Sequence, residues 1–447
     1  MRPDSKPVVA RNDDYYRTLY AEDPDFHVLG QRDPEFNAVL EHGSRLDFAN
    51  PTSVMQLTKT LLKLDFGLLA DLPMDRLCPP VPNRHNYILW LKDLLDSSSP
   101  SYLDPDAASQ PVRRSWSFIA TDVDAKSLCF ARKNAALNNL DSRIRIVGRN
   151  VTDLLIPLDD LGLETVNFVM VNPPFYTSEA ELLDLARQKS RPPNTACTGA
   201  PIEMVCDGGE IGFIRRIIDE SLVLRERVQW YTSMLGKQSS LEVLIPILKD
   251  RGVSNYAVTA FVQGNKTRRW AIGWSFGARR PSLGSSRGCE PSAGRKLLPN
   301  PTEKTVGVWS ALRVTSERLE QIICDTMQRL DLTSWTWHKP LARGIGWADG
   351  NVWGRAHRRK RARIKEGANL IRETAEDDPS ISQKKPECKV KRDTAQFAFG
   401  FSVAIHDNGD KGNDGDDISI VARWLQGNDY ALFESFTEFL RNSIQPH

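Results

Sequence analysis

The stretch that decides the expected fold is Val166-Asn-Phe-Val-Met-Val171, followed directly by Asn172-Pro173-Pro174-Phe175. Its first six residues are almost wholly apolar and β-branched or aromatic, which is typical of a strand buried inside a parallel sheet. Two prolines end the strand at once, because proline has no amide to donate to a ladder and restricts the residue before it. Ligands of open α/β sheets bind beyond the carboxyl ends of the strands, so a site is expected here.

The residues Asn172 to Phe175 suit a planar base that bears an exocyclic amine. The Asn172 side-chain oxygen and the Pro173 carbonyl can each accept one hydrogen of the amine, while Phe175 can stack on the ring and Pro174 keeps the turn rigid. The nitrogen lone pair then stays free to attack a methyl group. The alternative interpretation is an ordinary proline-rich turn after a core strand.

The length, composition and net charge are typical of an ordinary soluble globular protein. The 447 residues suggest two or three domains, and a net charge of +2 says little about partners. The polar start of the chain and the lack of an 18-residue apolar run argue against secretion and membrane spanning. The seven widely spaced cysteines without a CxxC pair predict a reducing compartment and no metal site.

An alternation of strands and helices surrounds the central stretch. Strands are expected at residues 116–120, 144–147 and 166–171, with an amphipathic helix over 127–140, and this order favours a doubly wound, Rossmann-like parallel sheet. Asp122 follows the first of these strands, where an acid can grip the ribose of a cofactor. Helix N-caps use aspartate as well, so Asp122 alone leaves both interpretations open.

A helix is also expected after the proline-rich segment Arg76-Leu-Cys-Pro-Pro-Val-Pro82. Arg84 then lies just inside the start of that helix, an unfavourable place for a cation, so it could hold a carboxylate. A surface arginine is the alternative. Further upstream, Thr52 or Ser53 is expected to cap a helix that stops at Gly67.

Basic residues form two further candidate surfaces. Lys266, Arg268 and Arg269 lie in a turn before an aromatic strand, where they could grip phosphates or form a solvated hairpin tip. Residues 277–301 are expected to be a linker, followed by a small α+β domain over 302–447. A disordered basic insertion at 354–394, with a cluster over 358–365, suits nuclear import, RNA binding or a solvated loop.

Several motifs together resemble a known family, the eukaryotic U6 small nuclear RNA adenosine N6-methyltransferases, with bacterial ribosomal RNA adenine N6-methyltransferases as distant relatives. They are RLDFANP, PPVPNRHNYILWL, ATDVD, VNPPFY and the block ending in DGGEIGFIRRII, spread over residues 33–276. The C-terminal domain looks like the family's RNA-binding region, which is similar to kinase-associated-1 domains.

The resemblance implies S-adenosylmethionine (SAM) as methyl donor, structured RNA, and U6 small nuclear RNA in particular, as substrate, and no metal. The matching positions imply catalysis at Asn172 to Phe175, and cofactor binding by Arg84, Asp122 and Asn172. The N-terminal helical arm over residues 1–75, with Arg45 and Lys59, corresponds to the RNA-binding part, and residues 76–276 to the methyltransferase domain. Nuclear localisation is expected, with the cytoplasm as alternative.

One departure from the family is serious. The family carries a strand and glycine loop of the form GIDIGTGAS before the strand that leads to the ribose acid, and here Val112-Arg-Arg-Ser-Trp116 passes straight into that strand. We expect either a loss in the gene model or a protein that binds SAM weakly. The rival functions are therefore an RNA-binding protein without catalysis and, less consistent with the motifs, a DNA or protein-glutamine methylase.

Overall fold

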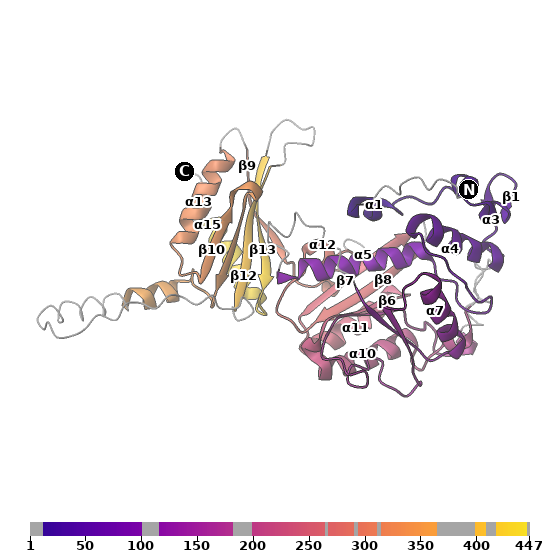
Figure 1. The fold of residues 1–447 in the computed structure, drawn as a ribbon. Helices are drawn as coiled ribbons and strands as arrows, with labels where there is room; N and C mark the ends of the chain where they lie inside the picture. The colour runs from indigo at the N-terminus through magenta and orange to yellow at the C-terminus, as the bar shows by residue number, and fades with distance from the viewer. Residues whose placement is uncertain are drawn as a thin grey trace, which may run out of the picture. The chain divides into compact units, whose positions relative to one another are not determined.

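The computed structural model describes residues 12–100, 116–181, 199–263, 267–289, 294–310, 314–363, 398–407 and 417–444. The chain divides into two compact units. Unit 1 comprises Met1–Asp96, Pro100–Phe276 and Ser285–Leu298, and unit 2 comprises Ser97–Ser99, Gly277–Gly284 and Pro299–His447. Each unit has its own hydrophobic core and is described by itself (Figure 1).

Unit 1 begins with short helices that pack around one longer helix, α4. The elements are α1 (Asp13–Thr18), α2 (Phe26–Arg32), α3 (Pro34–Asn37), β1 (Leu40–Glu41), β2 (Arg45–Leu46) and α4 (Pro51–Phe66). The predicted stop of α4 at Gly67 is confirmed, since Gly67 has φ of +67°. The predicted caps Thr52 and Ser53 are wrong, because Asn50 accepts from the Thr52 amide at 2.9 Å and Pro51 opens the helix.

The main sheet of unit 1 has the strand order β5-β6-β8-β7. Its strands are β5 (Val166–Val171), β6 (Val228–Leu235), β7 (Asn255–Gln263) and β8 (Thr267–Ser275). β5 and β6 are parallel, while the pairs β6–β8 and β7–β8 are antiparallel. The expected Rossmann-like class is thus observed, as a mixed rather than an all-parallel sheet.

Helices cover both faces of this sheet, as Figure 1 shows. On one face, α5 (Val81–Ser97) packs Tyr87, Leu91 and Leu94 against strand residues that include Trp230 and Phe261. On the other face lie α10 (Gly209–Leu224) and α11 (Gln238–Asp250), with a core formed by Ile214, Ile217, Leu241, Leu244, Tyr231 and Trp274. The short elements α9 (Pro201–Met204), η2 (Arg225–Arg227), α12 (Leu283–Ser286) and η3 (Arg295–Leu297) complete the connections.

A second, two-stranded sheet holds the remaining strands of unit 1. β3 (Phe118–Asp122) and β4 (Ile144–Gly148) pair in parallel, and α7 (Ala125–Leu137) connects them. Neither strand is hydrogen-bonded to β5. The expectation that β5 is buried is therefore wrong, since none of its six residues is buried. The reason is that, in the part of the chain the structure describes, β5 has a neighbour on one side only.

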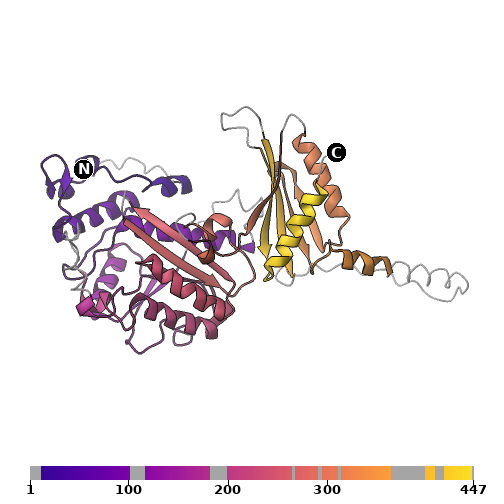
Figure 2. The ribbon, with the colours of Figure 1, turned by 180° about the vertical axis from the view of Figure 1, so that it is seen from behind.

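Unit 2 is an antiparallel sheet with two helices on one face, the expected α+β arrangement (Figure 2). Its strand order is β10-β11-β12-β13-β9. The elements are β9 (Glu303–Ser310), α13 (Ser316–Gln328), β10 (Ser334–His338), η4 (Lys339–Leu341), β11 (Arg343–Ala348), β12 (Phe399–Asp407), β13 (Asp417–Gln426) and α15 (Tyr430–Ser443). The sequence did not predict β11, because its two glycines lower the strand propensity.

Two segments differ from the sequence-based expectation. Residues 277–301, expected to be a linker, include the buried side chains Arg280, Cys289 and Leu298. Residues 355–363 of the basic insertion are helical, with Arg358 to Arg361 exposed, while the rest of the insertion lies outside the described residues. No helix among the described residues is both long and apolar enough to cross a membrane.

Arg280 yields a stability prediction for unit 2. It is 3% exposed, donates to the Gly427 carbonyl at 2.8 Å and to Asn428 Oδ1 at 3.1 Å, and lies 4.3 Å from the centre of the Trp424 ring. Burial lowers the pKa of Arg280 to about 10. We expect Arg280→Ala to destabilise unit 2 by about 2–4 kcal/mol, because it takes the donor from the buried Gly427 carbonyl and removes a buried side chain.

The measurement is urea-dependent hydrogen exchange of the β12 and β13 amides. Arg318→Ala, which removes an exposed arginine of α13, is the matched control and should change little. Equal stability of the two variants would contradict the role given to Arg280.

Candidate active site

The Asn172 to Phe175 segment leaves the sheet at the carboxyl end of β5. Val171 pairs with Ser233 of β6, so the segment begins beside the end of that strand. Pro173 is buried, whereas Asn172, Pro174 and Phe175 are partly exposed. The next residue is held in place through its backbone, because the Tyr176 amide donates to Met204 and the Cys206 amide donates to Tyr176, both at 3.0 Å. The segment is therefore anchored at both ends, with side chains accessible in between.

Arg84 of α5 contacts this segment directly. Its Nη1 donates to Asn172 Oδ1 at 2.9 Å and also lies 2.9 Å from the sulfur of Met234. Burial lowers the pKa of Arg84, and the nearby Arg269 lowers it further. Among the described residues no acidic side chain forms an ion pair with Arg84. A partly buried guanidinium with spare donors and a lowered pKa is a favourable partner for an external carboxylate.

Tyr87, one helical turn after Arg84, fastens α5 to the sheet. It is fully buried, and its hydroxyl lies 2.9 Å from Thr232 Oγ1 and accepts from the Val171 amide at 3.2 Å. Thr232 in turn donates to the Val169 carbonyl at 2.8 Å. Burial raises the pKa of Tyr87, so its hydroxyl stays neutral. This chain of contacts sets the position of Arg84 relative to Asn172.

Phe175 is positioned by the loop that follows β6. A Cβ atom at Gly236 would come within 2.9 Å of the Phe175 ring, so only glycine allows the ring to lie there. The buried Glu210, at the start of α10, accepts from the Gly236 amide at 2.6 Å and from Ser240. Arg269 of β8 lies 6.0 Å from the centre of the Phe175 ring. One face of the aromatic side chain is therefore packed against the protein, and a cation lies beside it.

Asp122 is the last residue of β3. Its side chain is exposed, and one carboxylate oxygen accepts from the Asp124 amide at 2.9 Å. In the part of the chain that the structure describes, no hydrogen bond joins Asp122 to Arg84 or Asn172. Asp122 is thus accessible to a ligand, but the described contacts do not bring it together with the other two residues.

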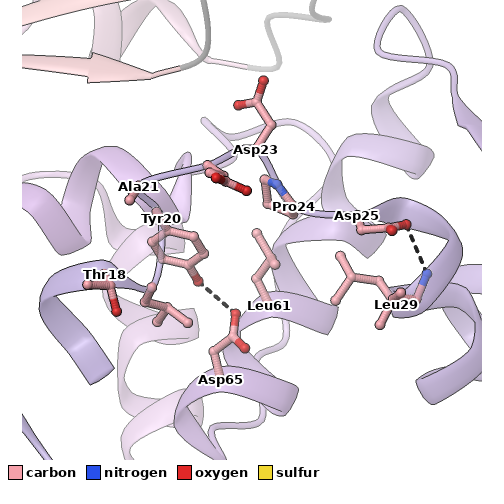
Figure 3. Close-up of a pocket in the computed structure, with 12 residues that line it drawn as sticks. Thr18, Tyr20, Ala21, Asp23, Pro24, Asp25, Leu29, Leu61 and Asp65 are labelled. Atoms are coloured by element: carbon pink, nitrogen blue, oxygen red, sulfur yellow. Dashed lines mark hydrogen bonds between the residues drawn. The ribbon is translucent and has the colours of Figure 1, made fainter. Parts of the chain in front are cut away.

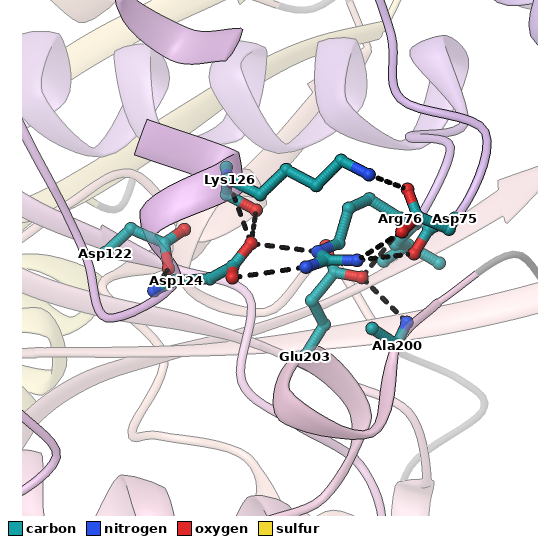
Figure 4. A network of polar contacts seen from close by, with 9 residues as sticks. Asp75, Arg76, Asp122, Asp124, Lys126, Ala200 and Glu203 are labelled. Carbon is teal, nitrogen blue, oxygen red and sulfur yellow. Dashed lines mark hydrogen bonds and ion pairs between the residues drawn. The ribbon is translucent and has the colours of Figure 1, made fainter. Parts of the chain in front are cut away.

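Asp124, two residues further on, is structural (Figure 4). It caps α7 through the Ser127 amide at 2.8 Å and accepts from Arg76 Nε at 2.8 Å. The Arg76 guanidinium holds the pKa of the Asp124 carboxyl well below its usual range. Nearby, Glu203 accepts from the amides of Leu77 and Ala200, both at 2.9 Å. The network ties the segment before α5 to α7 and α9, and so supports the start of α5 that carries Arg84.

The candidate RNA-binding residues lie in different parts of unit 1. Arg45 is exposed in β2, and Lys59 is partly exposed on α4. Arg268 is exposed and Arg269 partly exposed at the start of β8, while Lys266 lies outside the described residues. Of the four that are described, only Arg269 has a recorded contact with the Asn172 to Phe175 segment, through Phe175.

A hollow among the N-terminal helices is lined by acidic and apolar residues, in contrast to the basic candidate RNA-binding residues (Figure 3). Its lining includes Glu22, Asp23, Asp25 and Asp65 beside the apolar Leu29 and Leu61. Tyr20 donates to Asp65 at 2.9 Å, and burial together with this carboxylate raises the pKa of Tyr20. Carboxylates repel phosphates, so we expect this side of the N-terminal helices to face away from RNA.

The residues present fit only part of a SAM molecule. Arg84 would suit its carboxylate and Asp122 its ribose hydroxyls, and Asn172 contacts Arg84. A Rossmann-type cradle also needs a glycine turn whose backbone amides approach the ligand, and residues 68–147 contain no glycine at all. The described residues hold no group of three side chains suited to a metal ion.

Sequence reasoning missed Tyr87 and Glu210. Tyr87 could have been found from its spacing, since a residue three positions after Arg84 lies on the same helical face. Glu210 could have been found from the two glycines before it, because a carboxylate at a helix start is well placed to bind backbone amides.

The sequence was compared with family models and with curated proteins, and both comparisons match RNA methyltransferases. A family model described as RNA methyltransferase matches residues 8–278. A Schizosaccharomyces pombe protein named "U6 small nuclear RNA (adenine-(43)-N(6))-methyltransferase" is 31% identical over 415 residues, which cover 90% of this chain and 95% of that protein. The human "RNA N(6)-adenosine-methyltransferase METTL16" is 32% identical over 419 residues, 84% of this chain and 73% of that protein.

A solved structure agrees with the sequence comparisons. The human METTL16 catalytic domain, crystallised with a MAT2A 3'UTR RNA hairpin, superposes with a TM-score of 0.51 at 38% identity and covers 61% of this chain and 96% of that chain. The fold and the segment after β5 thus define a Rossmann-like methyltransferase. The chain belongs to the RNA methyltransferase family whose model it matches.

The network around Asp124 predicts a pH dependence. An aspartate whose pKa is lowered on folding stabilises the fold above its unfolded value of about 3.9 and loses that contribution as the pH falls through the folded value. Asp124→Asn keeps a capping oxygen but loses the ion pair with Arg76. We expect it to lower the melting temperature by a few degrees at pH 6, with the difference from the native chain shrinking below pH 4.

Thermal unfolding followed by circular dichroism at several pH values measures this difference. Asp141→Asn, at an exposed aspartate after α7, is the matched control. A difference between Asp124→Asn and the native chain that stays constant down to pH 2 would contradict the assigned ion pair.

Proposed function

We propose that the protein transfers a methyl group to N6 of an adenine in structured RNA, with SAM as the methyl donor. The observation that carries the proposal is the contact between Arg84 and Asn172 at the carboxyl end of β5, directly before two prolines and an aromatic residue. The names of the relatives, which specify adenine N6 methylation of RNA, support the same reaction.

The chain's own residues account for the recognition of the base. Asn172 Oδ1 has two lone pairs, so it can accept from Arg84 and from one hydrogen of the adenine amine together. The Pro173 carbonyl can accept the second hydrogen, and Phe175 can stack on the ring. With SAM bound, N6 would form its bond to the methyl carbon as the sulfur–methyl bond breaks and S-adenosylhomocysteine leaves, and N6 would release one proton, which solvent can accept. Catalysis of this kind depends on positioning, and the target base must first leave its stack.

The RNA partner follows from the relatives and from the distribution of charge. U6 small nuclear RNA is the substrate named for the fission yeast relative, and we propose it for this chain, together with a nuclear location. Arg45, Lys59, Arg268 and Arg269, with Lys266 outside the described residues, are proposed to contact phosphates. In unit 2, the exposed cations of the 355–363 helix are suited to the same purpose. We also propose that the N-terminal arm over 1–75 and the C-terminal domain over 302–447 both bind RNA.

A second candidate function is RNA binding without efficient catalysis. The separation of β3 from β5 favours it, because that edge of the sheet is where a cofactor would be held. The two functions differ in whether RNA is methylated at high SAM concentration.

Asn172 provides the first test of the methyltransferase proposal. With millimolar SAM and a U6-type hairpin RNA, we expect Asn172→Ala to lower the rate of N6-methyladenosine formation by roughly 100-fold or more, because the amine loses an oriented acceptor. Mass spectrometry of the digested RNA measures the product, and RNA affinity should change less than twofold.

Asn167→Ala is the matched control, since Asn167 is an exposed asparagine on β5, the strand that Asn172 follows. It should retain full activity. A rate for Asn172→Ala equal to that of Asn167→Ala would exclude the catalytic assignment, and an unmethylated RNA in every variant would favour the second candidate function.

The proposed RNA contacts predict a change in salt dependence. We expect Arg45→Ala and Arg268→Ala each to weaken RNA binding and to reduce the slope of log affinity against log salt concentration by about one. Filter binding at a series of salt concentrations from about 50 to 300 mM measures this slope, because phosphate contacts make the affinity depend on salt over this range. Arg215→Ala, at an exposed arginine of α10, should leave the slope unchanged. A loss of slope in all three variants would mean that net charge alone matters.

A further inference from the structure

The sheet of unit 1 is divided between β3 and β5. Among the described residues β3 pairs only with β4 and β5 only with β6, so within that part of the chain each strand has one open edge. Central strands of doubly wound sheets normally have neighbours on both sides and helices over both faces. Two open edges inside one compact unit are therefore unusual for this fold.

The burial of side chains places the division of the sheet at the same position, between β3 and β5. In β6, seven of eight residues are buried, whereas in the adjacent and more apolar β5 none is. In β3, four of five residues are exposed, and the side chain of Ile119 is 36% exposed. Apolar residues typical of a central strand thus remain accessible to solvent on both sides of the division.

Aromatic rings relate the two halves of the sheet to each other. The Phe168 ring of β5 lies 5.3 Å from the Trp116 ring and 6.1 Å from the Phe118 ring at the start of β3. Both contacts involve the first half of β5 and the residues at or just before the start of β3. β3 and β5 therefore belong to one surface, although no backbone hydrogen bond joins them.

The sequence before β3 contains no segment suited to form a strand between β3 and β5. A strand parallel to β3 and placed beside it must be connected to it by a crossover of a dozen residues or more, usually a helix. Residues 101–115, which lie outside the described part of the chain, read SYLDPDAASQPVRRS and contain neither an apolar run nor a glycine. The composition required for a strand, a glycine turn and a helix is missing at this point.

We infer that a polypeptide of this sequence lacks a strand–turn–helix segment of about 20–25 residues immediately before Trp116, and that it consequently holds SAM only weakly. The inference relies on the proposed function for the identity of the cofactor. Arg84, Asp122 and Asn172 remain to contact SAM, but the backbone amides of the turn after the absent strand do not. Restoring three such hydrogen bonds corresponds to roughly 100-fold in affinity.

The test compares three chains by isothermal titration with SAM. The first is the chain as it is. The second has an apolar strand, a glycine turn of the form GIDIGTGAS and a helix inserted before Trp116. The third has a Gly/Ser segment of equal length at the same place. We expect only the second chain to gain affinity, by roughly 100-fold. A native chain that binds SAM within tenfold of the second chain, or equal gains with both insertions, would overturn the inference.

Hydrogen exchange of the native chain provides a measurement that does not depend on whether the insertion folds. Amides of β3 and β5 should exchange roughly 100-fold faster than those of β6, because strands with an open edge open more readily. Equal protection of all three strands would overturn the inference.

RNA methylation separates this inference from the proposed function. An insertion chain that binds SAM tightly but leaves the hairpin RNA unmethylated would support the inference and contradict the proposed function.

Discussion

The parallel pairing of β5 with β6 is the constraint on which the rest of the candidate site depends. It places Val171 beside Ser233, so the Asn172 to Phe175 segment begins next to the loop that carries Gly236. Tyr87 of α5 contacts both paired strands, because its hydroxyl lies beside Thr232 of β6 and accepts from the Val171 amide of β5. If this pairing were lost, nothing in the described part of the chain would hold Arg84, Asn172 and Phe175 in their positions relative to one another.

The two sides of the candidate site differ in how completely they are built. Around Asn172 to Phe175, Glu210 and Gly236 hold the packing surface of Phe175, and Arg84 contacts the Asn172 amide. Around Asp122, the strand β3 pairs, within the part of the chain that the structure describes, with β4 alone. The physical difference is the number of ladder partners, since a strand with two neighbours is fixed along its length whereas an edge strand is not.

Much of the fold was predictable because it depends on local patterns. The apolar run before Asn172, the glycine stop at Gly67 and the amphipathic helix after Asp124 all depend on residues close in sequence. Errors arose where a neighbour in space decides the outcome. The burial of β5 was overestimated, because an apolar composition does not reveal whether a strand has a partner on both sides. β11 was missed because pairing with β10 and β12 overrides the low strand propensity of its glycines.

The sequence by itself determined the family, the Rossmann-like class and the segment Asn172 to Phe175, because these follow from motifs of contiguous residues. It also revealed that no glycine turn precedes the strand ending at Asp122. Only the tertiary structure decided that Arg84 contacts Asn172, that Tyr87 and Glu210 support the site, and that the sheet is divided between β3 and β5. These are contacts between residues far apart in the chain, and they are set by strand pairing and packing rather than by local preference.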